Sequence, residues 1–499
     1  MTNSIKSRLI RGSAWLTIAR AIVSALGLAS TFILAWYLTP SDYGLVAIGT
    51  TLLTILSAFT ELSLGAALIH HAAPKRSHYD TIFTLNVLRG LLLALIVAAS
   101  AYPISWFFED ARLVEIILAL SVSMLLGGLG NPYIAFLQRQ IIFSQEFAIS
   151  VAQKMSGFIV AIGLAYYYQT YWALIFGALV SQATMVVVSY AVLPYRPSFT
   201  LREVRELFGF SGWLSASQVV NTLNWNFDTL LVGKILNPTL LGFYTVGSNI
   251  SSMATREVTQ PFTGTVFTGF ANIRDNSERL AAAYQRVQAL VTAIALPVGV
   301  GTALLADPLV RLAMGDKWLP IVFIIQVLAA VFAFQTLGTL VQPLAMSIGQ
   351  TRLIFDRDWK LFALRVPVIA IALFSFGLPG VIFARVFTSA VGTVINLFMV
   401  RRLTDISILQ QLTFNIRAIC STGIMAVGVS VAWHAERAAG VTELMQIVTL
   451  SALGGAIYCV SSLALWSLAG RRPGPETEIF DILRNLLGFY RRRSTSQDH

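Results

Sequence analysis

Apolar runs of about 20 residues, separated by short polar segments, make up most of this chain. Read at about 1.5 Å per residue, such a run forms a helix as long as a membrane's hydrocarbon layer is thick. The pattern therefore predicts an all-α polytopic membrane protein with about 14 transmembrane helices. The expected spans are residues 14–38, 44–68, 81–105, 113–137, 148–168, 171–193, 211–236, 242–266, 284–306, 320–345, 359–378, 380–400, 416–434 and 443–469.

One pair of these runs occurs twice. The stretch WLTIARAIVSALGLASTFILAWYLTPSDYGLVAIG at 15–49 aligns without a gap with WLSASQVVNTLNWNFDTLLVGKILNPTLLGFYTVG at 213–247. Each copy has a proline that ends the first helix and a glycine that frees the following turn. Because the copies open the first and the seventh span, the repeat unit is six spans. We therefore expect two pseudo-symmetric six-helix bundles, related by an axis along the membrane normal, with a central cavity between them.

The same pattern gives the domain boundaries. We expect an N-terminal six-helix bundle at 1–197, an interfacial amphipathic linker helix at 198–210 and a C-terminal six-helix bundle at 211–402. Helices 13 and 14, at 403–470, fall outside the repeat. An amphipathic basic tail at 471–499 is expected on the cytoplasmic leaflet, although an ordinary solvated tail helix fits this segment nearly as well.

Composition and charge agree with a membrane protein. Hydrophobic residues make up 56% of the 499 positions and charged residues 12%, with a mean hydropathy of +0.71, whereas soluble domains carry about 25% charged residues. The net charge of +11 does not indicate nucleic acid, because the basic residues recur in short clusters between apolar runs. Placing these clusters on the cytoplasmic side puts both termini there. The basic residues that this orientation places on the opposite side are Arg112, Lys234, Arg311, Lys317 and Arg437.

The sequence contains no pattern typical of an enzyme. None of its histidines has a partner at metal-ligand spacing, and no phosphate-binding loop is present. Cys420 and Cys459 lie in apolar runs and are interpreted as packing residues. We therefore expect a secondary-type transporter without a cofactor or metal. A coupling ion, H+ or Na+, is left open.

Charged residues inside the N-terminal spans are the strongest functional signal, because charge is unfavourable in hydrocarbon. Arg20, Glu61 and Arg89 lie at similar depths of antiparallel helices, so they should cluster in the cytoplasmic third of the first bundle. Arginines there would form a cationic vestibule for a phosphate or an acidic sugar, since the guanidinium matches their oxygen atoms. For Arg20 and Glu61 a structural ion pair is equally compatible with the pattern.

The C-terminal spans carry a second set of polar residues. Arg256 in the eighth span and Arg385 in the twelfth are further candidates for substrate binding. Asp228 and Asn224 give the seventh span a polar stripe that would line a sugar path or bind a coupling ion; interhelical hydrogen bonding is the alternative. Arg365 is interpreted as an anchor that snorkels to the membrane interface.

Two segments resemble a known family. The run FILAWYLTPSDYGLVAIGTTLLTILSAFTELSLGAALIHH (32–71) and the run LLADPLVRLAMGDKWLPIVFIIQVLA (304–329) are similar to polysaccharide flippases of the Wzx type. These flippases are a branch of the multidrug/oligosaccharidyl-lipid/polysaccharide exporter superfamily that includes exopolysaccharide and colanic-acid exporters. The resemblance implies two six-helix bundles around a cationic cavity in the bacterial inner membrane.

The resemblance also implies a substrate and partners. The substrate is an undecaprenyl-diphosphate-linked oligosaccharide of an exopolysaccharide or O-antigen, moved to the periplasmic leaflet by alternating access. Membrane lipids, a polysaccharide polymerase and a chain-length regulator are the implied partners. Three alternatives stay open. They are a lipid II flippase, a cation-coupled drug antiporter of the same superfamily, and a non-transporting component or polymerase of a polysaccharide assembly complex.

Overall fold

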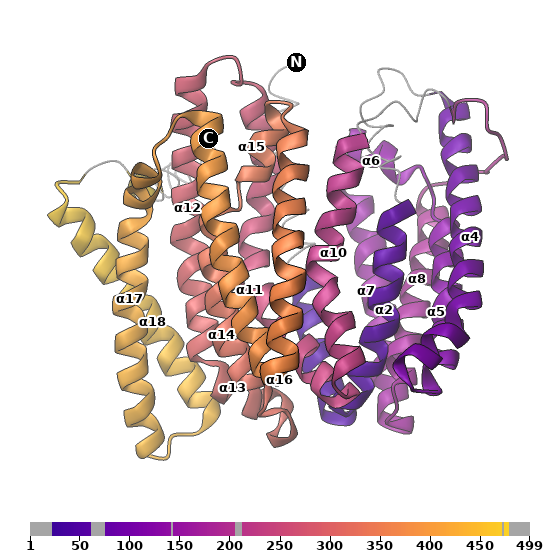
Figure 1. The fold of residues 1–499 in the computed structure, drawn as a ribbon, viewed down its shortest axis with the longest axis horizontal. Coiled ribbons are helices and arrows are strands. Elements are labelled where there is room, and N and C mark those ends of the chain that lie inside the picture. Colours follow the sequence, from indigo (N-terminus) through magenta and orange to yellow (C-terminus); the bar gives the residue numbers. More distant parts are fainter. Residues whose placement is uncertain (1–21, 61–74, 141–142, 205–211, 472–473, 479–499) are drawn as a thin grey trace, which may run out of the picture. The chain divides into compact units, whose positions relative to one another are not determined.

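The computed structural model describes residues 22–60, 75–140, 143–204, 212–471 and 474–478, and the regular elements in these ranges are helices (Figure 1). They form two compact units. Unit 1 consists of the described residues of Met1–Val246 together with Phe355–Val381, and unit 2 of those in Gly247–Ile354 and Ile382–His499. Each unit is described by itself.

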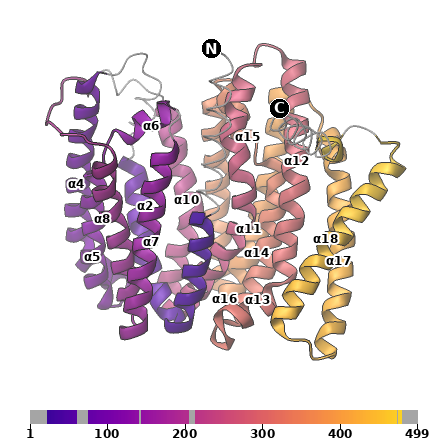
Figure 2. The same cartoon turned by 180° about the vertical axis from the view of Figure 1, so that it is seen from behind.

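Unit 1 is built from long helices that pack in antiparallel pairs. Helix α4 packs along α5, α7 along α8 and α2 along α10, as two opposite views show (Figures 1 and 2). Its helices are Ile22–Tyr37, α2 (Pro40–Thr60), α4 (Arg76–Phe108), α5 (Arg112–Gly128), α6 (Ile134–Gln140), α7 (Phe143–Tyr168), α8 (Trp172–Val192) and α10 (Gly212–Ile235).

Unit 2 contains the remaining helices. Helices α11 (Pro238–Ala271) and α16 (Thr351–Thr404) contribute residues to both units. The others are α12 (Ser277–Leu304), α13 (Ala306–Met314), η1 (Asp316–Trp318), α14 (Ile321–Gln335), η2 (Thr336–Gly338), α15 (Val341–Ser347), α17 (Ile408–Ala438) and α18 (Glu443–Leu468). Helix α12 packs on α14 and α17, and α17 packs on α18.

The expected all-α polytopic architecture is confirmed. Among the described residues, nine helical segments are long and apolar enough to cross a membrane. They cover ten of the predicted spans, because α16 contains two. The other predicted spans overlap Ile22–Tyr37, α5, α10 and α11, but the span predicted at 113–137 is too long, because α5 ends at Gly128 and a turn separates it from α6. The two spans of α16 meet at Gly377, whose φ of 61° and ψ of −143° suit glycine and break the helix.

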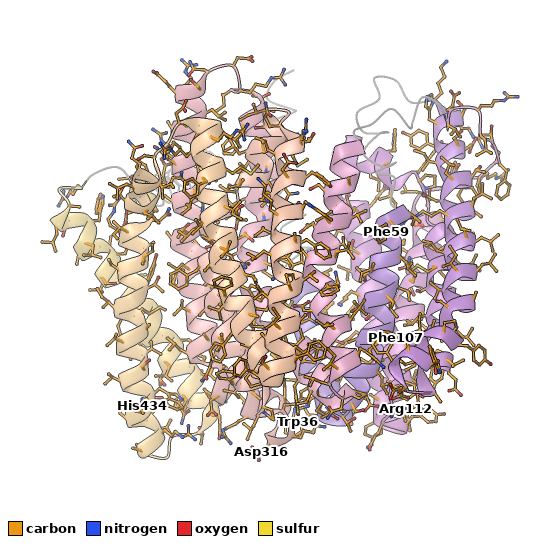
Figure 3. The ribbon with its side chains drawn as sticks, viewed as in Figure 1. Trp36, Phe59, Phe107, Arg112, Asp316 and His434 are labelled. Carbon is orange, nitrogen blue, oxygen red and sulfur yellow. The ribbon has the colours of Figure 1, made fainter. Side chains whose placement is uncertain are left out.

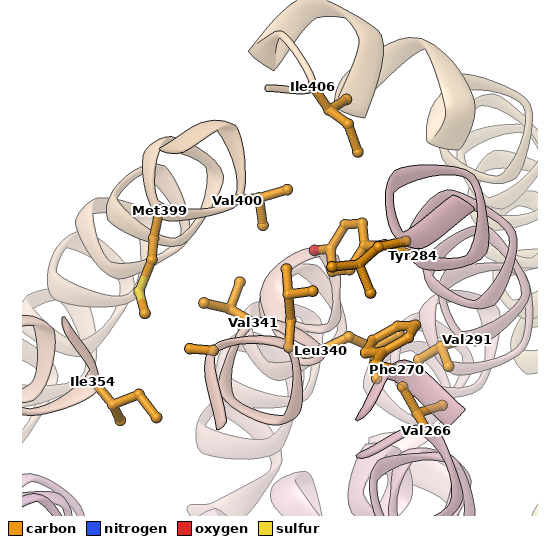
Figure 4. Close-up of a cluster of buried hydrophobic side chains, with 13 residues drawn as sticks. Val266, Phe270, Tyr284, Val291, Leu340, Val341, Ile354, Met399, Val400 and Ile406 are labelled. Carbon is orange, nitrogen blue, oxygen red and sulfur yellow. The ribbon is translucent and has the colours of Figure 1, made fainter. Parts of the chain in front are cut away.

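The interior of unit 2 at one end is a cluster of apolar side chains from distant parts of the sequence (Figure 4). Phe270 of α11 and the fully buried Tyr284 of α12 meet residues of α15 and α16 there. Burying such side chains together is the main favourable contribution to helix packing in the parts of a bundle that exclude lipid and water. The cluster comprises Val266, Phe270, Leu280, Tyr284, Val291, Leu340, Val341, Leu344, Ala345, Ile354, Met399, Val400 and Ile406.

The segment that follows α8 is hydrogen-bonded to the start of α4. The buried Asp80 accepts hydrogen bonds from the hydroxyls of Tyr195 and Ser198, the latter at 2.7 Å. Burial and this bond to Asp80 raise the pKa of Tyr195 above its usual value. The predicted linker helix at 198–210 is a turn at its described start, and residues 205–211 and most of the predicted tail lie outside the described residues. The predicted domain boundaries therefore stay a prediction.

Candidate functional site

A partly open cavity with a mixed polar and apolar lining lies in unit 1, between α2, α4, α5 and α8. Its volume is about 220 Å³. Arg89 of α4 lines it, and its role in binding a ligand stays a prediction. Its Nε donates to Thr60 Oγ1 at 2.9 Å and its Nη2 to the Ser57 carbonyl at 3.0 Å, so the guanidinium is held against the end of α2. The lining residues are Ser57, Asn86, Arg89, Gly90, Leu93, Ser123, Met124, Gly127, Gly128 and Gln182.

Two residues of the predicted vestibule cannot be placed. Arg20 and Glu61 lie outside the described residues. Their expected clustering with Arg89, and the alternative of an Arg20–Glu61 ion pair, therefore stay predictions. Of these three residues the structure describes Arg89, which lies beside the cavity.

A buried hydrogen-bond network joins α10 to the first half of α16. Asp358, 4% exposed, accepts from Ser217 Oγ at 2.7 Å and from Arg357 Nη2 at 2.7 Å. The Asp358 carbonyl accepts from Asn224 Nδ2 at 2.9 Å, and Arg365 Nη1 donates to the Asn224 carbonyl at 2.6 Å. Asn224 is thus engaged between two helices in this structure; its role in lining a substrate path stays a prediction.

This network corrects one interpretation and adds residues that the sequence pattern did not single out. The expectation that Arg365 snorkels to the interface is wrong, because it is only 9% exposed and lies over the Trp225 ring, 5.9 Å from its centroid. Arg357 and Asp358 were missed because they fall just before a predicted span and are typical of loop charges. The adjacent opposite charges in RDWK were the available signal.

Asp228 lies in the interior of unit 1. It is 1% exposed, accepts a hydrogen bond from the Tyr244 hydroxyl and another from the Thr229 backbone amide at 3.1 Å. Tyr244 belongs to α11, so the bond joins consecutive helices. This geometry fits the alternative in which Asp228 forms an interhelical hydrogen bond. A role of Asp228 in binding substrate or a coupling ion stays a prediction.

The two arginines of unit 2 that the sequence singled out, Arg256 and Arg385, have different environments. Arg385 is 1% exposed, with its guanidinium carbon 5.7 Å from the centroid of the Phe332 ring. Arg256 on α11 is exposed, and its side chain forms no hydrogen bond or ion pair with any residue that the structure describes. It follows Pro238 by about 27 Å of helix, close to the thickness of about 30 Å of a bilayer's hydrocarbon core. Arg256 is therefore the candidate most accessible to a ligand.

The repeated turns pack against each other inside unit 1. Pro40 and Pro238 are the first residues of α2 and α11, where a proline has no amide hydrogen to lose. A Cβ on Gly44 would overlap the carbonyl oxygen of Pro238 and lie 2.7 Å from its carbon. A Cβ on Gly242 would overlap the carbonyl oxygen of Pro40 and lie 2.6 Å from its carbon. The two copies of the motif thus make the same backbone contact in both directions.

Ion pairs fasten the polar ends of helices near Phe107 and Arg112, which lie at one end of unit 1 (Figure 3). Lys234 Nζ donates to Glu109 Oε1 at 2.8 Å, and Arg112 Nη2 to Asp110 Oδ2 at 2.7 Å. The bond from Lys234 lowers the pKa of Glu109, and the bond from Arg112 lowers that of Asp110.

The Asp110–Arg112 pair gives an expected pH dependence. Because the folded-state pKa of Asp110 is depressed, its contribution is present above the unfolded value of about 4 and is lost as pH falls through the folded value. Asp110→Asn should lower stability by less than about 1 kcal/mol at neutral pH. The difference between wild type and variant in thermal unfolding should disappear in acid; a difference that persists at the lowest pH would contradict this account.

Among the described residues, no group of three His, Cys, Asp or Glu side chains is placed to hold a metal ion. The polar side chains that line the cavity are an arginine, two carboxamides and two hydroxyls. These groups bind by hydrogen bonds and charge, and they suit anionic or hydroxyl-rich ligands.

Comparison with known proteins gives consistent matches. A family model described as "Polysaccharide biosynthesis protein" matches residues 33–323. "Lipopolysaccharide biosynthesis protein WzxC" of Escherichia coli (strain K12) is 24% identical over 400 residues, covering 79% of this chain and 81% of the relative. "Teichuronic acid biosynthesis protein TuaB" of Bacillus subtilis (strain 168) is 23% identical over 438 residues, covering 86% and 90%.

A solved structure shares the fold. The lipid II flippase MurJ, in an inward closed conformation, superposes with a TM-score of 0.71 at 16% identity, covering 90% of this chain and 98% of that one. At this level of identity the likeness concerns the arrangement of helices and not the ligand. It confirms the expected all-α polytopic fold.

Proposed function

Because this chain belongs to the family of polysaccharide biosynthesis proteins, we propose that it is a flippase for lipid-linked oligosaccharides. The substrate is an undecaprenyl-diphosphate-linked repeat unit of an exopolysaccharide or O-antigen, and the direction is from the cytoplasmic to the periplasmic leaflet of the bacterial inner membrane, with both termini of the chain cytoplasmic. The names of the two relatives, which concern lipopolysaccharide and teichuronic acid biosynthesis, support this class of substrate. A polymerase and a chain-length regulator are proposed partners.

The physical problem that such a protein solves is the passage of a hydroxylated, charged headgroup through hydrocarbon. Moving these groups from water into an apolar medium without compensating hydrogen bonds is strongly unfavourable. A path lined with donors lowers this barrier, while the polyprenyl tail stays in the bilayer. Alternating access, in which the path opens first to the cytoplasm and then to the periplasm, is the mechanism that we propose.

The observation that carries the proposal is Arg256. It is an exposed arginine within a membrane-length helix that has no ionic or hydrogen-bond partner among the described residues. An arginine in this position is unfavourable in lipid and is expected to face water or an anionic ligand. Its guanidinium can hold a diphosphate by two parallel hydrogen bonds, which an ammonium group cannot do. Arg89 is the second residue proposed to contact the headgroup.

Transfer of a fluorescent undecaprenyl-diphosphate oligosaccharide across liposomes containing the purified protein tests this function. Arg256→Ala should slow transfer by about 10- to 100-fold, the loss expected for a charge-assisted hydrogen bond. Arg256→Lys should retain part of the rate because the charge remains. Arg402→Ala, at an exposed arginine in the last turn of α16, is the control.

Wild-type protein without transfer activity, or Arg256→Ala with an unchanged rate, would contradict the proposal. Lipid II and a cationic dye, offered in the same liposomes, separate the alternatives. Faster transfer of lipid II would identify a lipid II flippase, and efflux of the dye coupled to an ion gradient would identify a drug antiporter.

A further inference from the structure

We propose that the cavity inside unit 1 binds a single sugar ring of the glycan and recognises it through its hydroxyl groups. The inference rests on the proposed function, since it names the part of the substrate that this cavity takes. It assigns the cavity to glycan selection rather than to the diphosphate. Three features of the cavity support it: lining carboxamides without partners in the described chain, a lining without carboxylates, and a wall of closely packed helices.

Two carboxamides face the cavity without partners in the described chain. Asn86 on α4 and Gln182 on α8 both line it, and neither side chain hydrogen-bonds to a residue that the structure describes. The hydroxyl of Ser57 on α2 donates only to the thioether of Met124, at 3.4 Å, which is a weak acceptor. Polar groups within a membrane bundle need hydrogen-bond partners, so these side chains suit a polar ligand.

The chemistry of the lining favours hydroxyl groups over a metal ion. None of the lining side chains is a carboxylate, the ligand that hard cations prefer. Each carboxamide offers two N–H donors and one carbonyl acceptor, which matches a sugar hydroxyl that both donates and accepts. Arg89 adds a fixed positive charge at one side, beside Thr60. A ring that carries a carboxylate would place it there.

The size and the wall of the cavity suit one ring. About 220 Å³ corresponds to roughly seven waters at about 30 Å³ each, so the cavity has the scale of one ring rather than of an oligosaccharide. The wall is rigid where α4 and α5 meet, because a Cβ on Gly90 would lie 2.8 Å from Gly128 Cα. Gly127 is different: a Cβ there would meet only Gln182 Nε2, at 3.5 Å, which is an ordinary contact. Gly127→Ala therefore narrows the cavity without disturbing the backbone.

Thiol labelling of the full-length protein tests this assignment. Ser123→Cys places a thiol in the cavity wall, in a background where the exposed Cys420 and Cys459 are replaced by alanine. A small methanethiosulfonate should label it, and glucose or glucuronate at ten times its Kd should slow labelling by about tenfold. Inorganic phosphate should not slow it. Asn86→Leu and Gln182→Leu should remove the protection, whereas Ser100→Ala, on α4 outside the cavity, should keep it.

Four results would overturn the proposal. They are a thiol in the Ser123→Cys variant that does not react, labelling that neither sugar slows, protection by phosphate alone, and protection unchanged in Asn86→Leu and Gln182→Leu. Gly127→Ala is the control for misfolding. It should weaken the protection of the thiol by sugar while the unfolding temperature of the protein stays unchanged. If a sugar protects the thiol from labelling but the protein transfers no glycan in liposomes, the proposed function is contradicted and the sugar site is retained. If the protein transfers glycan but no sugar protects the thiol, the sugar site is contradicted and the proposed function is retained.

Discussion

Alanine at Gly44 or at Gly242 should destabilise the protein by about 3 kcal/mol, the upper part of the range for overpacking. A Cβ at either position overlaps a backbone carbonyl, Pro238 for Gly44 and Pro40 for Gly242, so no side chain can rotate away. The first turns of α2 and α11 would have to separate. This effect is opposite to the usual one, because alanine is a better helix former than glycine by about 1 kcal/mol.

Thermal unfolding of the purified protein in detergent measures this effect. Gly163→Ala on α7 and Gly301→Ala on α12 are matched controls, since a Cβ at either position meets nothing within 4 Å. They should be neutral or stabilising. The double variant Gly44→Ala/Gly242→Ala should lose much less than the sum of the single losses, because one separation relieves both overlaps. Additive losses, or single variants as stable as the controls, would show that the turns do not pack as described.

Asp358→Ala should cost about 3–5 kcal/mol of stability, because removing one member of a buried ion pair leaves the other uncompensated. Arg357 would lose both bonds to Oδ1, and Ser217 would lose its acceptor. Asn224 and Arg365 would keep their bonds, since these involve backbone carbonyls. The expected damage is therefore confined to the contact between α10 and the start of α16.

Asp356→Ala is the matched control for this prediction. It lies two positions earlier on α16, is partly exposed and has no side-chain partner among the described residues, so it should change the unfolding temperature little. Asp358→Asn should be intermediate, because an amide keeps one acceptor oxygen. The double variant Arg357→Met/Asp358→Leu should be more stable than Asp358→Ala, because apolar replacement leaves no unpaired charge. If Asp358→Ala unfolds at the same temperature as Asp356→Ala, the network does not hold these helices together.

Much of the fold follows from one property of the sequence. A membrane-length apolar run has to be helical, because backbone groups in lipid have no water to bond with. The predicted spans therefore coincide with helices where the structure describes them, including the two spans of α16 that the backbone of Gly377 separates. The short helix α13 and the break at η2 were not expected. They depend on local turns around Gly315 and Gly338 whose effect a hydropathy pattern does not contain.

The candidate site was less predictable. The sequence pointed to Arg89 and Arg256 because each is a charge inside an apolar run, and the structure finds one beside a cavity and the other exposed. It did not point to Asn86 or Gln182, because uncharged amides are common in membrane helices. Their importance comes from facing the same space from α4 and α8, which are far apart in the chain.

By itself, the sequence determined the membrane-spanning helices, the internal repeat and the family, since each is carried by neighbouring residues or by direct similarity. Only the tertiary structure decided which polar side chains are satisfied and which face an open cavity. The sequence marked Asp228 and Asn224 only as polar residues of one span, whereas the structure shows that Tyr244 donates to Asp228 and that Asn224 donates to the Asp358 carbonyl; their part in a substrate path stays a prediction. Hydrogen bonds act over about 3 Å, and only the folded packing of helices brings such partners within that distance.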